Sequence, residues 1–356
     1  MGGSKNEFMG FDLNNIIREN IKGLKPYSSA RDEYVSNGSG MVYMDANENP
    51  FENGVNRYPD PQQRTLKGLL AKQKEVSTEN ILLGNGSDEV LDLLFRAFCE
   101  PKEDNIITLP PTYGMYGVLA GLNGVENREL LLNKDFQPDV EAILNAVDFN
   151  SKLLFICSPN NPTGNSISNE HITALLREFN GLVIVDEAYI DFCDASSWVS
   201  KLAEFPNLVV TQTFSKAYGM AGIRLGICVA AKEIIAVLNK IKPPYNVNEL
   251  TQQKALERLS YGLRIISEVS EIKEQKGLVA QVLSSIPFVQ EVYPSDANFL
   301  LVRVDDADLR YTQLLEKGIV VRNRSSQPLC KNTLRITIGT PEENIKLIGV
   351  LKELEK

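Results

Sequence analysis

The chain has 356 residues, 43% of them hydrophobic and 23% charged, which is an ordinary composition for a globular protein of about two domains. Its 37 basic and 46 acidic side chains give a net charge of −9, which argues against nucleic-acid binding because such proteins need a basic surface. One histidine and five scattered cysteines exclude the common zinc sites and Ser-His-Asp triads, so no metal is expected.

Residues 1–44 are polar and uneven, and we expect them to form an N-terminal arm that belongs to a smaller domain. They contain no signal-peptide core, because Lys5, Glu7 and Asp12 interrupt every apolar run. No segment of the chain approaches the roughly 18 apolar residues of a membrane span. A cytoplasmic location is therefore predicted.

Residues 45–245 are predicted to form a large α/β domain, with a mostly parallel central sheet flanked by helices. Helical patterns at 87–98 and 169–179 alternate with short runs rich in Val, Ile and Leu. Runs of this kind are typical of strands buried on both faces of a parallel sheet. The predicted strands are 80–84, 105–109, 152–158, 182–188, 207–213 and 224–230.

The pattern changes near Lys242-Pro243-Pro244, which marks the predicted boundary with a smaller α+β domain over residues 246–356. This domain is expected to open with a long helical stretch at about 247–284, which contains few helix breakers, and to close with a helix from Pro341. Its predicted strands are 288–293, 298–304, 318–322 and 333–339.

Two glycine- or proline-rich turns follow predicted strands of the large domain. GNGSDE (84–89) opens a helix, where free N–H groups and the helix dipole favour a phosphate. It lacks the third glycine of a dinucleotide fingerprint, which disfavours a nicotinamide oxidoreductase. CSPNNPTGNS (157–166) is a sharp turn at the carboxyl edge of the sheet, where α/β proteins bind ligands. Each segment alone is also consistent with a turn that has no other role.

Two further segments contain charged groups that suit covalent chemistry. In VIVDEAYIDF (183–192), Asp186 ends an apolar run, and a buried carboxylate needs a cation such as a protonated pyridine nitrogen. In TQTFSKAYGMAGIRLG (211–226), Lys216 lies near hydroxyl groups and Arg224, an arrangement that can form a Schiff base beside a bound phosphate. The alternatives are a strand end that turns into solvent and a solvated loop lysine.

Together, SPNNPTG, DEAY, SK and IRLG resemble the fold-type-I pyridoxal-phosphate aminotransferases in their order and spacing. The resemblance implies that Lys216 forms the covalent link to pyridoxal 5'-phosphate and that Asp186 pairs with the pyridinium nitrogen. It also implies that Asn161 and Tyr189 hydrogen-bond the phenolate oxygen of the ring and that Tyr113 stacks on its face. The remaining residues implied to surround the phosphate are Gly86, Ser87, Asp88, Thr213, Ser215 and Arg224.

Further segments resemble the histidinol-phosphate aminotransferase family, namely YMDANENPF (43–51), NRYPDP (56–61), PPTYGMY (110–116) and LRITIG (334–339). The resemblance implies a homodimer in which Tyr58 reaches the cofactor phosphate of the other subunit. The substrate-binding residues expected from it are Arg335 and Arg322 for anionic groups, with Tyr27 and Asn47. One departure is Ser87, where many members of the family carry alanine.

The reaction implied by this resemblance is the transamination of L-histidinol phosphate with 2-oxoglutarate, which gives imidazole-acetol phosphate and L-glutamate in histidine biosynthesis. The alternatives on the same fold are an aromatic aminotransferase and a phosphothreonine decarboxylase. A cofactor-binding regulator is disfavoured, because the chain shows neither a helix-turn-helix segment nor a basic face.

Overall fold

The computed structural model describes residues 11–27 and 42–354, which contain a seven-stranded and a four-stranded sheet. The larger sheet has the order β1-β7-β6-β5-β4-β2-β3, and only β7 runs antiparallel to its neighbours. Its strands are β1 (Ile81–Asn85), β2 (Asn105–Thr108), β3 (Glu126–Glu129), β4 (Ser151–Cys157), β5 (Leu182–Asp186), β6 (Leu208–Thr213) and β7 (Leu225–Ala230). The predicted mostly parallel α/β sheet is confirmed.

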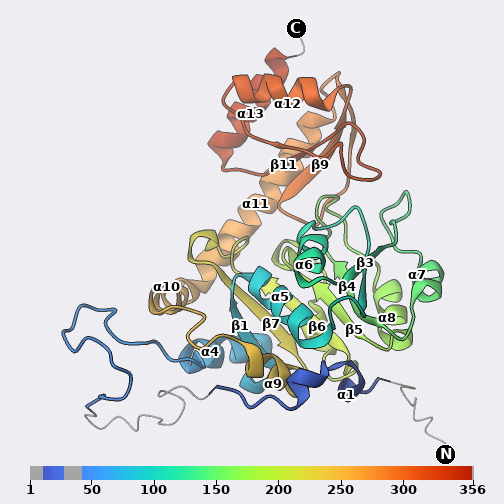
Figure 1. The fold of residues 1–356 in the computed structure, drawn as a ribbon. Coiled ribbons are helices and arrows are strands. Elements are labelled where there is room, and N and C mark those ends of the chain that lie inside the picture. The colour runs from blue at the N-terminus through green and yellow to red at the C-terminus, as the bar shows by residue number, and fades with distance from the viewer. Residues whose placement is uncertain (1–10, 28–41, 355–356) are drawn as a thin grey trace, which may run out of the picture.

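Helices cover both faces of this sheet (Figure 1). Successive residues of a strand point to opposite faces, so Val183 and Val185 pack in one core while Leu182 and Ile184 pack in the other. The first core is shared by α4 (Arg64–Lys74), α7 (Val140–Ala146), α8 (Asn169–Glu178) and α10 (Glu249–Leu259). The second is shared by α1 (Leu13–Ile16), α2 (Glu19–Lys22), α5 (Ser87–Phe98), α6 (Met115–Asn123) and α9 (Lys232–Ile241).

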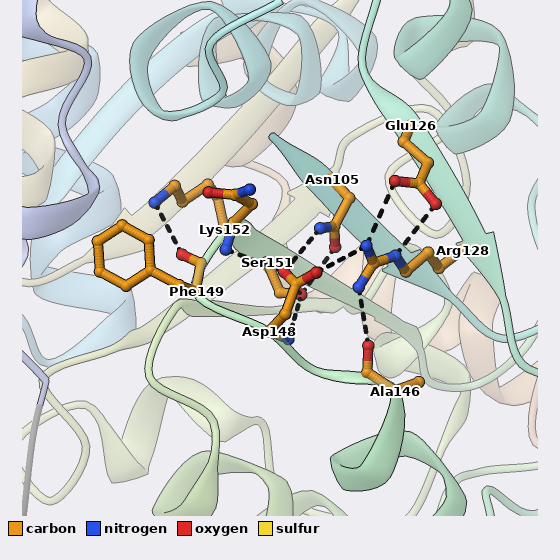
Figure 2. A network of polar contacts seen from close by, with 9 residues as sticks. Asn105, Glu126, Arg128, Ala146, Asp148, Phe149, Ser151 and Lys152 are labelled. Carbon is orange, nitrogen blue, oxygen red and sulfur yellow. Dashed lines mark hydrogen bonds and ion pairs between the residues drawn. The ribbon is translucent and has the colours of Figure 1, made fainter. Parts of the chain in front are cut away.

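A polar network ties together the amino ends of β2, β3 and β4 (Figure 2). The Asp148 carboxylate accepts a hydrogen bond from the Asn105 amide at 3.0 Å and pairs with the Arg128 guanidinium at 2.7 Å. The Arg128 guanidinium also reaches Glu126 at 3.1 Å, and the Ser151 hydroxyl donates to the Asn105 amide oxygen at 2.7 Å. These contacts fix one end of the sheet, and the predicted functional residues lie at the other.

The four-stranded sheet is antiparallel, in the order β10-β11-β9-β8, and lies above the larger sheet in Figure 1. The 22-residue helix α11 (Gly262–Leu283) runs up toward it from the larger sheet. The other elements of this part are β8 (Val289–Val292), β9 (Phe299–Val304), α12 (Ala307–Glu316), β10 (Arg322–Asn323), β11 (Thr333–Thr337) and α13 (Pro341–Glu353).

Two predicted elements of the C-terminal part are wrong in detail. The helical stretch 247–284 is two helices, α10 and α11, because Ser260 ends the first one before Gly262 begins the second. The predicted strand 318–322 is reduced to β10, since the preceding residues end helix α12 instead. Gly318 has a left-handed φ of 74°, and the Ile319 N–H donates to the Leu314 carbonyl at 2.9 Å, so neither is available for strand pairing.

Candidate active site

A cavity of about 340 Å³ lies at the carboxyl ends of β4, β5 and β6, between the larger sheet and the antiparallel sheet. It brings together most of the residues that the sequence predicted for the site. Its lining consists of Ser87, Asp88, Tyr113, Cys157, Asn161, Asp186, Ala188, Tyr189, Thr213, Ser215, Lys216, Ala221, Arg224, Arg322, Arg324 and Arg335. Gly86, which was also predicted, precedes Ser87 as the N-cap residue of α5.

The turn that opens α5 lies at one end of the cavity. Gly86 has a φ of 80°, and a Cβ added there would lie 2.7 Å from the Arg224 guanidinium. The Arg224 guanidinium also lies 3.5 Å from Asp88 and donates to the Ser215 hydroxyl at 3.4 Å. The first-turn N–H groups of α5, the helix dipole and this guanidinium would together attract a phosphate.

Asp186 is buried at the end of β5, and only one of its two carboxylate oxygens accepts a hydrogen bond from a side chain in the part of the chain that the structure describes. Its Oδ2 accepts a hydrogen bond from the Tyr116 hydroxyl at 2.7 Å, whereas its buried Oδ1 has no partner among residues 11–27 and 42–354. Burial raises the pKa of this carboxyl to about 6. An unpartnered buried carboxylate oxygen is costly, so a protonated ring nitrogen fits this position.

Lys216 projects into the cavity from the loop after β6, and its amine is 6.0 Å from the centroid of the Tyr189 ring. Partial burial lowers the pKa of this amine, and the positive charges of Arg335 and Arg224 lower it further. A larger fraction of the amine is therefore neutral near pH 7, which is the form that acts as a nucleophile or a base.

Asn161 and Arg335 connect the two sheets across the cavity. The Arg335 guanidinium donates to the Asn161 amide oxygen at 2.5 Å. Because that oxygen is engaged, the amide is oriented with its NH₂ group available as a donor. Tyr113 donates its hydroxyl hydrogen bond to the Asp88 carboxylate at 3.1 Å, so this ring is also held in place.

Three predicted residues lie outside this cavity in the single chain. Asn47 and Tyr58 line a separate surface hollow of about 430 Å³, and the Tyr58 ring stacks on Tyr245 with centroids 4.4 Å apart. Tyr27 has 72% of its surface exposed. The structure therefore does not bring these residues together with Lys216, and their roles stay predictions.

Sequence reasoning missed Arg324 and Tyr116. Arg324 follows Arg322 by two residues, a spacing that places two side chains on one face of a strand and could have identified it. Tyr116 lies in PPTYGMY, but its bond to Asp186 joins residues 70 positions apart and had no local signal.

Within the described parts of the chain, no group of three or more His, Cys, Asp or Glu side chains could hold a metal ion. No helix in the same residues is long and apolar enough to cross a membrane. The reactive groups that line the cavity include one lysine amine, one unpartnered carboxylate oxygen, several guanidinium groups, and hydroxyl groups such as that of Tyr189.

Residues 44–351 match the family model for aminotransferase class I and II, and the chain belongs to that class. It is 64% identical over 345 residues to the histidinol-phosphate aminotransferase of Flavobacterium johnsoniae, a match that covers 97% of this chain and 99% of that relative. Within the class, the chain is a member of the histidinol-phosphate aminotransferase family.

Solved structures agree with this assignment. The histidinol-phosphate aminotransferase from Clostridium acetobutylicum superposes with a TM-score of 0.78 at 27% identity, over 85% of this chain and 91% of that chain. The enzyme of that name from Sinorhizobium meliloti, solved in complex with pyridoxal-5'-phosphate, has a TM-score of 0.75 at 23% identity, over 84% of this chain and 83% of that chain. The second likeness shows the fold alone.

Proposed function

We propose that the protein catalyses the pyridoxal-phosphate-dependent transamination of L-histidinol phosphate with 2-oxoglutarate, giving imidazole-acetol phosphate and L-glutamate. The observation that carries this proposal is the presence in one cavity of the Lys216 amine, the unpartnered Asp186 oxygen and the Arg335 guanidinium. The family's identity over nearly the whole chain supports this donor rather than an aromatic amino acid or phosphothreonine.

The residues present fit the cofactor. The turn at Gly86 and Ser87, with Arg224, would hold its phosphate, and Asp186 would pair with its ring nitrogen. The Asn161 NH₂ group and the Tyr189 hydroxyl would donate to its ring oxygen. When bound, pyridoxal phosphate supplies an aldehyde that carries the amino group and a ring that delocalises the electrons left by the departing proton.

Lys216 moves the proton in this mechanism. Its neutral Nζ would accept the α-proton of the substrate and donate it to the cofactor carbon on the other side of the substrate nitrogen, which its position on a loop inside the cavity permits. Asp186 remains ionised beside a cation and stabilises it electrostatically. Arg335 and Arg322 bind the anionic end of each substrate in turn, so the phosphate of one and a carboxylate of the other share a site.

The proposal is tested by glutamate formation from histidinol phosphate and 2-oxoglutarate, compared with tyrosine and with phosphothreonine as donors. We expect the highest kcat/KM for histidinol phosphate. Carbon dioxide release from phosphothreonine, or a preference for tyrosine, would favour one of the alternative reactions.

Replacing Arg335 by alanine should weaken the binding of both substrates, because the variant loses the guanidinium that pairs with the phosphate of one and a carboxylate of the other. The loss of a charge-assisted bidentate contact is expected to reduce kcat/KM roughly ten- to a hundredfold for histidinol phosphate and 2-oxoglutarate. Histidinol, which has no phosphate, should lose less, and Arg335→Lys should recover only part of the activity. Equal losses for histidinol and histidinol phosphate would instead indicate a role in the fold or in cofactor binding.

We also propose a homodimer in which Tyr58 completes the partner's site. Exposed apolar side chains near Tyr58 support a covered surface there, since Met44 is 90% and Phe51 79% exposed in the single chain. Mixing Lys216→Ala with Tyr58→Ala subunits should then restore part of the activity, because one site of each mixed dimer has both residues. The Tyr58 variant must be inactive alone. No recovery after proven subunit exchange would contradict a shared site.

A further inference from the structure

Arg324 lies on the same wall of the cavity as Arg322 and Arg335. Arg322 pairs with Arg335 across β10 and β11, and the Arg324 N–H donates to the Thr333 carbonyl at 2.8 Å, which continues the pairing. Residues two apart on a strand share a face, and directly paired residues share it too. Three guanidinium groups therefore project from one face of the antiparallel sheet into the cavity.

This wall has no negative charge to balance it. None of the three arginines forms an ion pair with a carboxylate in the residues that the structure describes, and the buried Nε atoms of Arg324 and Arg335 have no acceptor there. The cavity lining contains five cationic side chains (Lys216, Arg224, Arg322, Arg324 and Arg335) and two carboxylates, Asp88 and Asp186. The cofactor phosphate proposed beside Arg224 would offset part of this excess of positive charge, which leaves the three arginines of the wall available for an anionic substrate group.

Arg324 differs from Arg322 in its surroundings. Arg322 is exposed, whereas Arg324 is partly buried, and that burial together with the neighbouring Arg322 lowers the pKa of its guanidinium. A partly buried guanidinium whose Nε has no acceptor among residues 11–27 and 42–354 gains more from an incoming anion than an exposed one, because it has already lost part of its hydration.

We propose that Arg324 is a specificity-determining residue that binds the phosphate dianion of the amino donor. A carboxylate has two oxygens and one charge, which one guanidinium such as that of Arg335 can satisfy in a bidentate pair. A phosphate monoester has three terminal oxygens and close to two charges at pH 7, so it can engage a second guanidinium. Arg324 thus increases the affinity for phosphorylated donors more than the affinity for substrates that carry only carboxylates. This inference rests on the proposed function in assigning the phosphate to the amino donor.

The test measures binding to the holoenzyme by calorimetry with two ligands that carry no amino group, propyl phosphate and glutarate. Arg324→Gln should lower the affinity for propyl phosphate roughly ten- to a hundredfold and the affinity for glutarate by much less. Arg324→Lys should recover part of the affinity, since an ammonium keeps the charge but not the planar fork. The matched control is Arg177→Gln, on the exposed surface of α8, which should change neither affinity.

Equal weakening of both ligands, or of neither, in a variant with unchanged thermal stability would overturn the role of Arg324. If Arg324→Gln proves unstable, the Arg324→Lys variant tests the role of Arg324 instead. The quantity compared is again the ratio of the affinities for propyl phosphate and glutarate. A separate measurement of turnover by the wild-type enzyme distinguishes a failure of the proposed reaction from a failure of the role of Arg324. Failure to use histidinol phosphate would refute the proposed function, while the phosphate-to-glutarate ratio would still decide the role of Arg324.

Discussion

Lys216→Ala should reduce kcat for histidinol phosphate by at least about a thousandfold, because the variant loses both the covalent attachment and the group that moves the α-proton. The cofactor should still bind without the covalent link, since Arg224 and the turn at Gly86 and Ser87 are unchanged. The measurement is kcat together with the equilibrium affinity for pyridoxal phosphate. A loss of turnover with retained cofactor is the expected pair of results.

The control for this substitution is Lys201→Ala, which removes an exposed lysine that pairs with Glu204 at 2.7 Å. Surface pairs of this kind contribute little to stability, so kcat should not change. If Lys216→Ala retained most of its turnover, the proton would be moved by another group, and the assignment of Lys216 would be wrong.

Asp186→Asn should lower kcat by roughly a hundred- to a thousandfold while preserving the shape of the side chain. An amide cannot carry the negative charge that stabilises a protonated ring nitrogen, and electrostatic groups of this kind typically contribute that much. Tyr116 donates to Asp186 Oδ2, and it can still donate to an amide oxygen at that position, so the local fold should survive. A variant with normal kcat would show that the carboxylate is not part of the mechanism.

The same carboxyl should make the cofactor-free protein less stable as the pH rises. Its folded-state pKa is about 6, above the ordinary value of 3.8, so the folded protein binds more protons between these values than the unfolded chain. The free energy of unfolding should fall by up to about 3 kcal/mol from pH 4 to pH 7, and Asp186→Asn should lose this dependence. Denaturant titrations of the wild-type protein and of Asp186→Asn between pH 4 and pH 7 measure this change in the free energy of unfolding. Parallel pH profiles would contradict the raised pKa.

Local patterns were sufficient to predict six of the seven strands of the larger sheet, whereas β3 was missed because its four residues are polar and none of them is buried. The helix 87–98 was predicted with the observed bounds, because acidic residues follow Ser87 and its apolar positions recur at helical spacing. The strand 318–322 failed because the apolar run Gly318–Val321 could be read as a strand, whereas the left-handed Gly318 ends α12. The domain boundary at residue 245 stays a prediction.

Most of the predicted site residues line one cavity, but the contacts between them were not predicted. Lys216, Asp186 and Arg224 could be identified because each belongs to a short motif at or between strand ends. The contact between Asn161 and Arg335 joins residues 174 positions apart, and no sequence pattern places a side chain of the second sheet against a loop of the first. Arg324 was missed although its spacing from Arg322 pointed to it, because an arginine at a strand end is most often solvated, and only the structure shows that it lines the cavity.

Reduction of the holoenzyme with borohydride, followed by peptide mapping, tests the account most directly. The reagent converts the link between cofactor and lysine into a stable secondary amine, which marks the lysine that holds the cofactor. Lys216 should carry the label in the wild-type enzyme, and Lys216→Ala should take up none. A label on any other lysine, or none in a protein that transaminates histidinol phosphate, would contradict the placement of the active site in this cavity.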